Sequence, residues 1–328
     1  MGMRSFVLVA AAACGNHLAP AGDCTTPDGG GAPVVETVSL QPGELQFDDL
    51  AFDPDTNHVL AAPEGVGRVF VVDADAMTVT SFATSTGVGS IDGRGGQVFL
   101  ADRGTGEIVV ATEADGQVVA HTPLGAGPDY VRVTPAGDEV WVTLPGDGRI
   151  DIYTVSPLVK IADISLGDPE GLTFDGAGHA YTNDGGTVVQ LDVASHAISG
   201  RWSDGCGGSH GFPQADAARN VAIGGCRASG GVGAIDLTTG DTHGFEAGGG
   251  PAILAYDPTA HHLFLRGDPG NTLDILGVCA DGSLATLGSA PIPERGHGAH
   301  VDASGHAWVA DALGGGLVRV TDPYPVTP

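Results

Sequence analysis

Positive charge is scarce in this chain. Lys160 is its only lysine, and 13 basic residues stand against 40 aspartates and glutamates, which gives a net charge of −27. A surface of that sign repels phosphate backbones, so the composition argues against a nucleic-acid partner. It favours simple solubility outside the cell.

Aromatic residues and long apolar runs are scarce as well. Phe, Tyr and Trp make up 5% of the sequence, and glycine or proline interrupts nearly every stretch long enough for a helix. Beyond the N-terminus, no segment stays apolar for the roughly 18 residues that a membrane-spanning helix needs. The 54 glycines are typical of many short strands joined by tight turns. These features favour an all-β fold.

The N-terminus has the order of a secretion signal. In MGMRSFVLVAAAACGNHLAP, Arg4 supplies positive charge, Phe6–Ala13 forms a short apolar core, and small residues precede Cys14. Because AAAC resembles a bacterial lipobox, we predict a signal peptide at 1–13 and lipidation of Cys14. An ordinary signal peptide cleaved near this residue is the alternative. Residues 14–32, rich in Gly, Pro, Thr and Asp, indicate a flexible stalk.

These N-terminal features predict the cellular location. We expect an exported lipoprotein, held at a membrane by its lipid alone, on the periplasmic face or at the cell surface. The sequence leaves open whether the inner or the outer membrane carries it.

One pattern recurs along residues 33–328. A strand is followed by a turn of Asp, Pro, Ala or Gly and then by a second strand, as in DDLAFDPDTNHVLAA (48–62), DPEGLTFDGAGHAYTND (168–184) and GHGAHVDASGHAWVAD (296–311). Six clear copies and one weaker copy, at 87–102, begin 40 to 45 residues apart. That period is typical of the four-stranded blades of a β-propeller. We therefore predict a single seven-bladed propeller domain.

The two ends of the repeat region predict how the ring closes. The last blade lacks a fourth strand, and the unpartnered strand PVVETVSL (33–40) precedes the first blade. If this N-terminal strand completes the seventh blade, the ring closes and leaves no open sheet edge.

The five cysteines suit an exported protein with disulfides. Cys206 precedes the first strand of blade 5 and Cys226 follows its second strand, so antiparallel pairing should bring them together. With Cys14 lipidated, Cys24 and Cys279 remain, and we pair them by elimination. No C-x-x-C pair suggests a structural metal site.

Two short motifs imitate functional ones. GGSHG (207–211) matches G-x-S-x-G, but it leads into a strand and lacks the strand–turn–helix context of a nucleophile elbow. DPDTN (53–57) with Glu64 imitates a calcium loop, but His58 stands where that loop needs glycine. We interpret this second segment as a hairpin turn.

The repeat register brings polar residues to one place. In a propeller the first strand of each blade is innermost, and all first strands begin at the same end of the central channel. The seven starting positions hold Asp48, Val88, Asp129, Glu170, His210, Ala252 and His297. The candidate ligand residues at this channel mouth are therefore the five polar ones, Asp48, Asp129, Glu170, His210 and His297.

Three uses of this ring are open. Carboxylates and imidazoles can hold a divalent metal such as calcium, magnesium or zinc, or act as acid and base. The best metal set is Asp129, Glu170, His210 and His297. The third use is plain solvated lining of a water-filled channel, and we commit to no catalytic residue. Four other histidines near the turns, His179, His261, His262 and His306, are expected to be structural or exposed.

The repeats also resemble known families. GPDYVRVTPAGDEVWVT (127–143) and SHGFPQADAARNVAIGGC (209–226) resemble blade units of YVTN-type, YncE-like propellers, and PEGLTFDGAGHAYTND (169–184) resembles the related NHL unit. The YVTN tetrapeptide itself is absent. The resemblance implies a seven-bladed propeller, most often exported, with a binding role.

Two enzyme groups share that shape. Gluconolactonase and regucalcin-like propellers place a Glu, an Asn and an Asp on a divalent metal, and Glu170 in PEGLTF resembles their glutamate. Streptogramin lyases use His and Glu with magnesium, which His210 or His297 with Glu170 could imitate.

Our leading hypothesis is a surface-anchored, non-enzymatic binding or scaffold propeller. It would act as a monomer and bind a protein, a glycan or a small ligand. The competing hypothesis is a metal-dependent hydrolase or lyase with its site in the channel.

Overall fold

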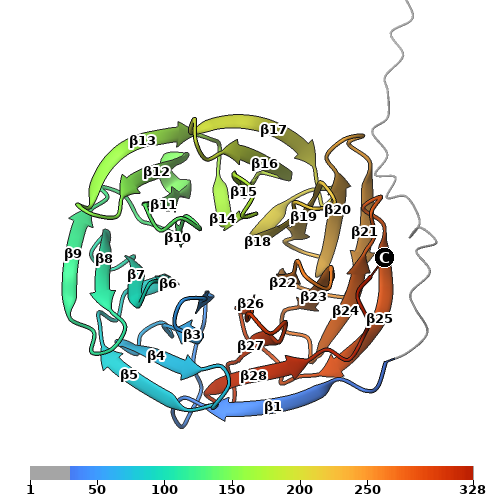
Figure 1. The fold of residues 1–328 in the computed structure, drawn as a ribbon, viewed down its shortest axis with the longest axis horizontal. Coiled ribbons are helices and arrows are strands. Elements are labelled where there is room, and N and C mark those ends of the chain that lie inside the picture. Colours follow the sequence, from blue (N-terminus) through green and yellow to red (C-terminus); the bar gives the residue numbers. More distant parts are fainter. Residues whose placement is uncertain (1–29, 328) are drawn as a thin grey trace, which may run out of the picture.

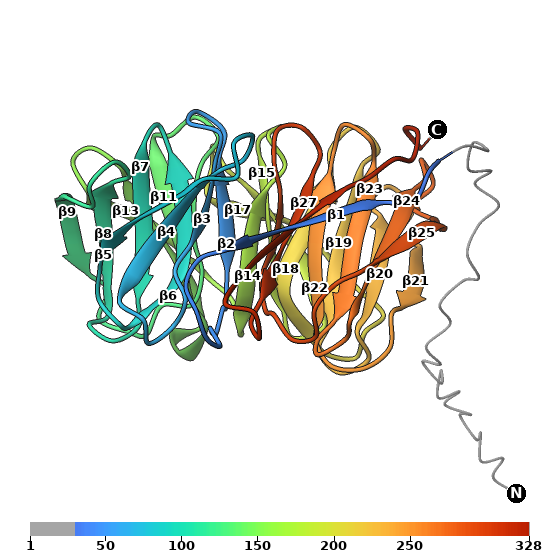
Figure 2. The same cartoon turned by 90° about the horizontal axis from the view of Figure 1, so that it is seen from below.

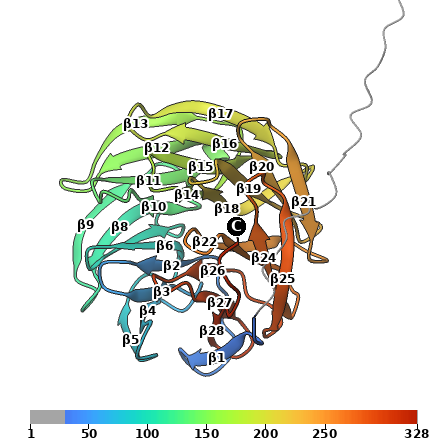
Figure 3. The same ribbon diagram turned by 45° about the vertical axis from the view of Figure 1, so that its right-hand side comes forward.

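The computed structural model describes residues 30–327. Seven four-stranded antiparallel sheets stand around a central channel, which confirms the predicted seven-bladed β-propeller (Figure 1). Within each blade the strands follow one another from the channel outward. An oblique view shows the innermost strands grouped around the channel (Figure 3).

The strands of the first four blades have the following bounds. Blade 1 contains β2 (Leu50–Asp53), β3 (His58–Ala61), β4 (Arg68–Asp73) and β5 (Val79–Ala83). Blade 2 contains β6 (Val88–Arg94), β7 (Gln97–Asp102), β8 (Glu107–Thr112) and β9 (Val118–Pro123). Blade 3 contains β10 (Val131–Val133), β11 (Glu139–Leu144), the short 3₁₀ helix η1 (Pro145–Asp147), β12 (Arg149–Thr154) and β13 (Val159–Ser165). Blade 4 contains β14 (Pro169–Phe174), β15 (His179–Asp184), β16 (Thr187–Asp192) and β17 (Ala197–Ser203).

The remaining blades complete the ring. Blade 5 contains β18 (Ser209–Asp216), β19 (Val221–Cys226), β20 (Gly231–Asp236) and β21 (Thr242–Glu246). Blade 6 contains β22 (Ala252–Asp257), β23 (His262–Gly267), β24 (Thr272–Val278) and β25 (Leu284–Pro291). Blade 7 contains β26 (Ala299–Val301), β27 (Ala307–Asp311) and β28 (Gly316–Thr321), with β1 (Val34–Ser39) outside them.

The core lies between neighbouring blades. Second strands are covered on both faces, and the largest fully buried side chains include Trp141 in β11 and Trp308 in β27. Outer strands are covered on one face only, which leaves Val118 and Val119 of β9 about half exposed. The many Val, Ile and Ala residues suit this arrangement because small and β-branched side chains fill the narrow space between pleated sheets.

Aspartates hold the turns between strands. The carboxylate of Asp53 accepts the backbone N–H of Asp55 at 2.8 Å, and Asn57 follows with a φ of 60°. Asp302 accepts the N–H groups of Ser304 and His306 at 2.9 and 3.0 Å. DPDTN is therefore a hairpin turn, as interpreted from the sequence. Part of the large acid content has this structural role, since an aspartate can satisfy the free backbone donors of a tight turn.

The ring closes as the sequence predicts. β1 pairs antiparallel with β28 over six residues, from Val34 opposite Thr321 to Ser39 opposite Gly316. The guanidinium of Arg319 in β28 binds Glu36 of β1 at 2.6 Å and donates to the carbonyl of Ala74 in blade 1 at 2.7 Å. The N-terminal strand thus covers the outer edge of blade 7, where it lies beside β28 (Figure 1). A side view shows β1 running along the outside of the ring (Figure 2).

The predicted disulfide of blade 5 is present. Cys206 and Cys226 are bonded, with their Cα atoms 5.0 Å apart and 20 residues between them in sequence. Closing a loop of that length contributes on the order of 3 kcal/mol to stability. Cys14 and Cys24 lie outside the described residues, so lipidation and the pairing of Cys24 with Cys279 remain predictions. In residues 30–327 no helix is long and apolar enough to cross a membrane.

Deleting Val34–Ser39 should destabilise the whole ring rather than one blade. The loss exposes the edge of β28 and should lower the free energy of unfolding by on the order of 5 kcal/mol, a large part of the stability of a typical domain. Denaturant unfolding followed by circular dichroism measures this. The control Glu36→Gln loses only a half-exposed ion pair and should cost about 1 kcal/mol or less. If the deletion unfolded like the intact protein, closure by β1 would be wrong.

Candidate functional site

The channel mouth where the first strands begin is organised by an arginine that the sequence analysis missed. Arg103 directly follows β7. Its Nη2 binds the carboxylates of Asp48 and Asp129, the latter at 2.6 Å, and its Nη1 binds Glu64 at 3.0 Å. Two of the five predicted residues are therefore brought together, but by a cation of the chain itself. The guanidinium also donates to the carbonyl of Pro128 at 3.3 Å.

The charged groups at this channel mouth shift each other's pKa values. Burial raises the pKa of Asp129 to about 7, because the nearby Asp48 and Glu170 add to the cost of its charge and Arg103 offsets only part of it. The pKa of Arg103 lies above its usual range because the attraction of Asp48 and Asp129 outweighs its own burial. The mouth is a compact ion-pair network in which one cation serves three acids.

The other predicted residues are spread around this network. Glu170 forms an ion pair with Arg227. The imidazole of His297 lies 3.8 Å from Asp48 and 3.8 Å from Asp268, and its ring packs on Phe212 with centroids 5.3 Å apart. His210 lies in β18 opposite Gly225, and its side chain is outside what the structure describes.

The predicted metal set of Asp129, Glu170, His210 and His297 stays a prediction, because the side chain of His210 lies outside what the structure describes. Among the side chains that the structure describes, no three His, Cys, Asp or Glu residues are grouped as metal ligands. Asp48 and Asp129 share the guanidinium of Arg103, and Glu170 is paired with Arg227. We derive no reaction step through a metal.

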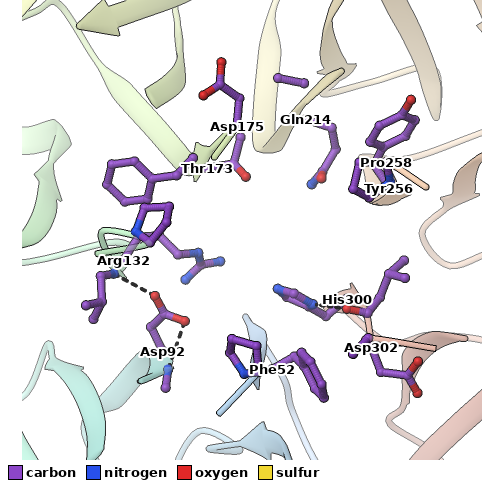
Figure 4. A pocket seen from close by; sticks show the side chains of 18 of the residues that line it. Phe52, Asp92, Arg132, Thr173, Asp175, Gln214, Tyr256, Pro258, His300 and Asp302 are labelled. Carbon is purple, nitrogen blue, oxygen red and sulfur yellow. Dashed lines mark hydrogen bonds between the residues drawn. The ribbon is translucent and has the colours of Figure 1, made fainter. Parts of the chain in front are cut away.

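The opposite end of the channel contains a cavity. It has a volume of about 410 Å³, and its walls come from the ends of the first strands and from the turns that follow them. Figure 4 shows side chains from all seven blades around this opening. Five polar residues occupy one equivalent position in the first strands of blades 2, 3, 4, 5 and 7, namely Asp92, Arg132, Thr173, Gln214 and His300.

Backbone irregularities help to place two of these residues. The pairing of β14 with β15 shifts register between Glu170 and Thr173, and that of β18 with β19 shifts between His210 and Gln214. Such bulges re-aim the side chains that follow. Gly171, inside the first bulge, has a φ of 70°, and a Cβ there would meet the backbone nitrogen of Phe212 at 2.7 Å. Only glycine allows the two inner strands to approach so closely.

Arg132 is fixed by a buried acid. Its Nη1 and Nη2 bind the two oxygens of Asp49 at 2.6 and 2.8 Å, and Nη1 also donates to the carbonyls of Ile91 and Val131 at 3.2 and 2.8 Å. Asp49 additionally accepts the hydroxyl of Ser90 at 2.5 Å. A bidentate pair of this kind holds the guanidinium plane in one orientation. The cavity wall is rigid at this point.

Asp92 and His300 are both shifted toward their neutral forms. The oxygens of Asp92 accept the backbone N–H groups of Gly93 and Val133 at 2.9 and 2.7 Å, but burial outweighs these bonds and Arg132 and raises its pKa to about 6. Burial lowers the pKa of His300, whose Nδ1 lies 2.9 Å from the carbonyl of Val301. Asp92 is absent from the aligned strand starts, and strand alternation predicts that His300, three residues after His297, points mostly to the other side.

Aromatic rings and a second hollow extend the site. Phe52, Phe174 and Tyr256 line the cavity, and the hydroxyl of Tyr256 is bound at 2.5 Å by Asp216 behind it. A second hollow of about 670 Å³ lies over the turns of blades 3 and 4. It shares Phe174, Thr134 and Pro135 with the channel cavity. The two hollows therefore adjoin each other along these three residues.

The four turn histidines have structural roles, as expected. His179 binds Asp175 at 3.0 Å, His306 binds Asp302 at 2.9 Å, and His261 binds Asp216 at 2.7 Å. His262 is fully buried, and its Nδ1 forms a hydrogen-bond contact with the carboxylate of Asp322. GGSHG leads into β18 and not into a helix, so it has no nucleophile-elbow geometry.

Comparison with known proteins gives a fold and no family. The sequence matches no protein-family model, and no curated protein matches it. Solved structures do resemble it. A streptogramin B lyase structure has a TM-score of 0.70 and 13% identity, covering 88% of this chain and 98% of its own. The likeness shows the fold alone.

Other similar structures have different functions. A chain of Kuenenia stuttgartiensis hydrazine synthase has a TM-score of 0.68 and 14% identity over 89% of this chain and 98% of its own. The RRP9 WD40 repeats have a TM-score of 0.75 and 12% identity over 90% and 100%. Since such propellers include enzymes and repeat scaffolds, their shape establishes no specific function for this chain.

The raised pKa of Asp129 predicts a pH dependence. Between about pH 4 and pH 7 the folded protein keeps a proton that the unfolded chain has lost, so Asp129 makes stability fall as pH rises. In Asp129→Asn this contribution is absent. The free energy of unfolding of the variant, relative to wild type, should rise by about 1 kcal/mol per pH unit through that window and stay level above it. Urea unfolding at several pH values measures the difference; a constant difference would contradict the assignment.

Proposed function

We propose that this protein is an exported, lipid-anchored binding propeller related to the YVTN-type repeat proteins. It acts as a monomer without catalysing a reaction, and it presents the channel cavity to ligands outside the cytoplasm. Cys14 carries the anchor, and the segment up to residue 32 holds the propeller away from the membrane.

One observation carries the binding role. Five of seven blades contribute a different polar side chain at one equivalent position, and all five line a single cavity. A cavity of about 410 Å³ falls within the range of small-ligand sites, which combine apolar walls with a few placed polar groups. Lining of a plain water channel needs neither the aromatic walls nor the fixed orientation of Arg132.

One observation favours the competing class. Asp92, with its pKa raised to about 6, lines the same cavity as the neutral imidazole of His300, and such a pair could exchange protons as acid and base. This would support a hydrolase or lyase in the channel. We prefer binding because both oxygens of Asp92 already accept backbone N–H groups.

Pools of small molecules test the binding role. Sugars, amines, carboxylates and divalent cations are each added to the full-length protein during thermal unfolding. At ten times its dissociation constant, a true ligand should raise the melting temperature by about 2 °C or more. The shift should be lost in Gln214→Leu and kept in Gln117→Leu, a matched change at an exposed turn.

The same samples separate binding from catalysis. NMR of the added compound should show no product after prolonged incubation. Conversion of an added compound that disappears in Asp92→Asn would overturn the non-enzymatic role. If no pool changed the melting temperature, small-ligand binding would be overturned.

The anchor is tested by fractionating cells. Wild-type protein should sediment with membranes, and Cys14→Ser should leave them, because the acyl chains supply the membrane affinity. Cys24→Ser is the matched control and should stay with the membranes. If wild type and Cys14→Ser were equally soluble, the lipoprotein proposal would be wrong.

A further inference from the structure

We infer that the channel cavity binds the terminal sugar of a neutral glycan, with the next sugars lying in the adjoining hollow over blades 3 and 4. This inference rests on the proposed binding function and names its ligand class. Three features support it: the hydrogen-bonding groups of the cavity, the charged groups of its wall and the hollow that adjoins it.

The polar wall offers mixed donors and acceptors in planar groups. The carboxamide of Gln214 and the hydroxyl of Thr173 each offer a donor and an acceptor. Each oxygen of Asp92 accepts one backbone N–H and keeps a second lone pair for a ligand. A sugar hydroxyl both donates and accepts, and neighbouring hydroxyls are spaced to engage a planar group through two bonds. A ligand with only donors or only acceptors would leave part of this wall unsatisfied.

His300 contributes an acceptor. Since a carbonyl oxygen can only accept, the 2.9 Å contact with Val301 places the proton on Nδ1. Burial lowers the pKa of His300 and keeps the ring neutral. Nε2 is then left as an acceptor suited to a hydroxyl.

The cations of the cavity wall are paired within the protein, and carboxylates remain. Arg132 is paired with Asp49 and Arg94 with Asp55. Three further carboxylates line the cavity, those of Asp175, Asp257 and Asp302. An anionic ligand would meet these carboxylates in a chain of net charge −27. The hydroxyl groups of a neutral sugar can donate hydrogen bonds to them.

Apolar walls suit the remaining faces of a sugar ring. Phe52 and Tyr256, both largely buried, line the cavity on the sides of blades 1 and 6. Their rings can pack against the C–H groups of a pyranose, and such contacts bury apolar area without demanding charge. Figure 4 shows these two rings at the margin of the opening.

The adjoining hollow favours a chain over a free monosaccharide. It adjoins the cavity at Phe174, which lines both, and its acids accept hydrogen bonds from the protein. Glu139 accepts the indole N–H of Trp141 at 2.8 Å and binds His196 at 3.0 Å, and Asp138 accepts the hydroxyl of Thr134 at 2.7 Å. The hollow is therefore polar, like the cavity, and adds about 670 Å³.

Titration calorimetry of the full-length protein tests this inference. The probes are glucose, galactose and N-acetylglucosamine, then maltotetraose, cellotetraose and chitotetraose, with choline and acetate as charged comparisons. At least one tetraose should bind, and more tightly than its monosaccharide. Gln214→Leu should weaken binding about tenfold, the equivalent of one lost hydrogen bond. Gln117→Leu should leave it unchanged.

A second variant tests the path of the chain. Ala177, exposed in the turn of blade 4, lines the hollow. Ala177→Trp should remove the advantage of the tetraose and spare the monosaccharide. If the wild-type protein bound the tetraose and the monosaccharide equally, the site would be assigned to free sugars. The inference of a glycan ligand would then be wrong.

The remaining outcomes separate the two proposals. Binding of choline or acetate without any saccharide would overturn the ligand class and leave the binding function standing. Absence of binding by every probe and every pool would overturn both. Saccharide binding that survives in Gln214→Leu would place the site elsewhere.

Discussion

The pairing of β1 with β28 is the interaction on which the rest of the structure depends. The C-terminal segment supplies only three strands to blade 7, and the fourth comes from the other end of the chain. This pairing fixes the circumference of the ring, and Arg319 extends it to blade 1 through Glu36 and the carbonyl of Ala74. Without a closed ring the seven inner strands have no common axis, and neither end of the channel is formed.

The two ends of that channel are chemically different. At one end Arg103 gathers Asp48, Glu64 and Asp129 into a single ion-pair network. At the other end the guanidinium of Arg132 is bound to Asp49, and the polar side chains around it line an open cavity. With only 13 cationic side chains, the chain uses two of them to balance acids along its own axis.

The sequence predicted the fold better than the site, and the reason is physical. Blade period, ring closure and the Cys206–Cys226 bond follow from local patterns, because strand alternation and turn residues act over short distances. Arg103 was missed because it follows a second strand, and only the ring geometry brings it to Asp129, 26 residues away in sequence. The partner of Glu170, Arg227, was not anticipated either, because it lies in the next blade.

The cavity residues could have been found by comparing a different position of the aligned repeats. Arg132 and His300 each stand three residues after a position that we aligned, and their counterparts in other blades are polar as well. What the sequence does not give is which positions face the channel, since bulges in β14 and β18 shift the register before Thr173 and Gln214. The protonation of a side chain such as Asp92 is harder still to predict from a local sequence pattern, because it depends on burial in the folded protein.

A crystal structure of the full-length protein grown with a neutral tetraose tests the central claim most directly, namely that the ligand binds at the Arg132 end of the channel and not at the Arg103 mouth. The account predicts sugar density in the cavity, within hydrogen-bond distance of Gln214, Thr173 and His300, continuing over blades 3 and 4. Sugar density at the Arg103 mouth, or only on the outer rim of the ring, would contradict it.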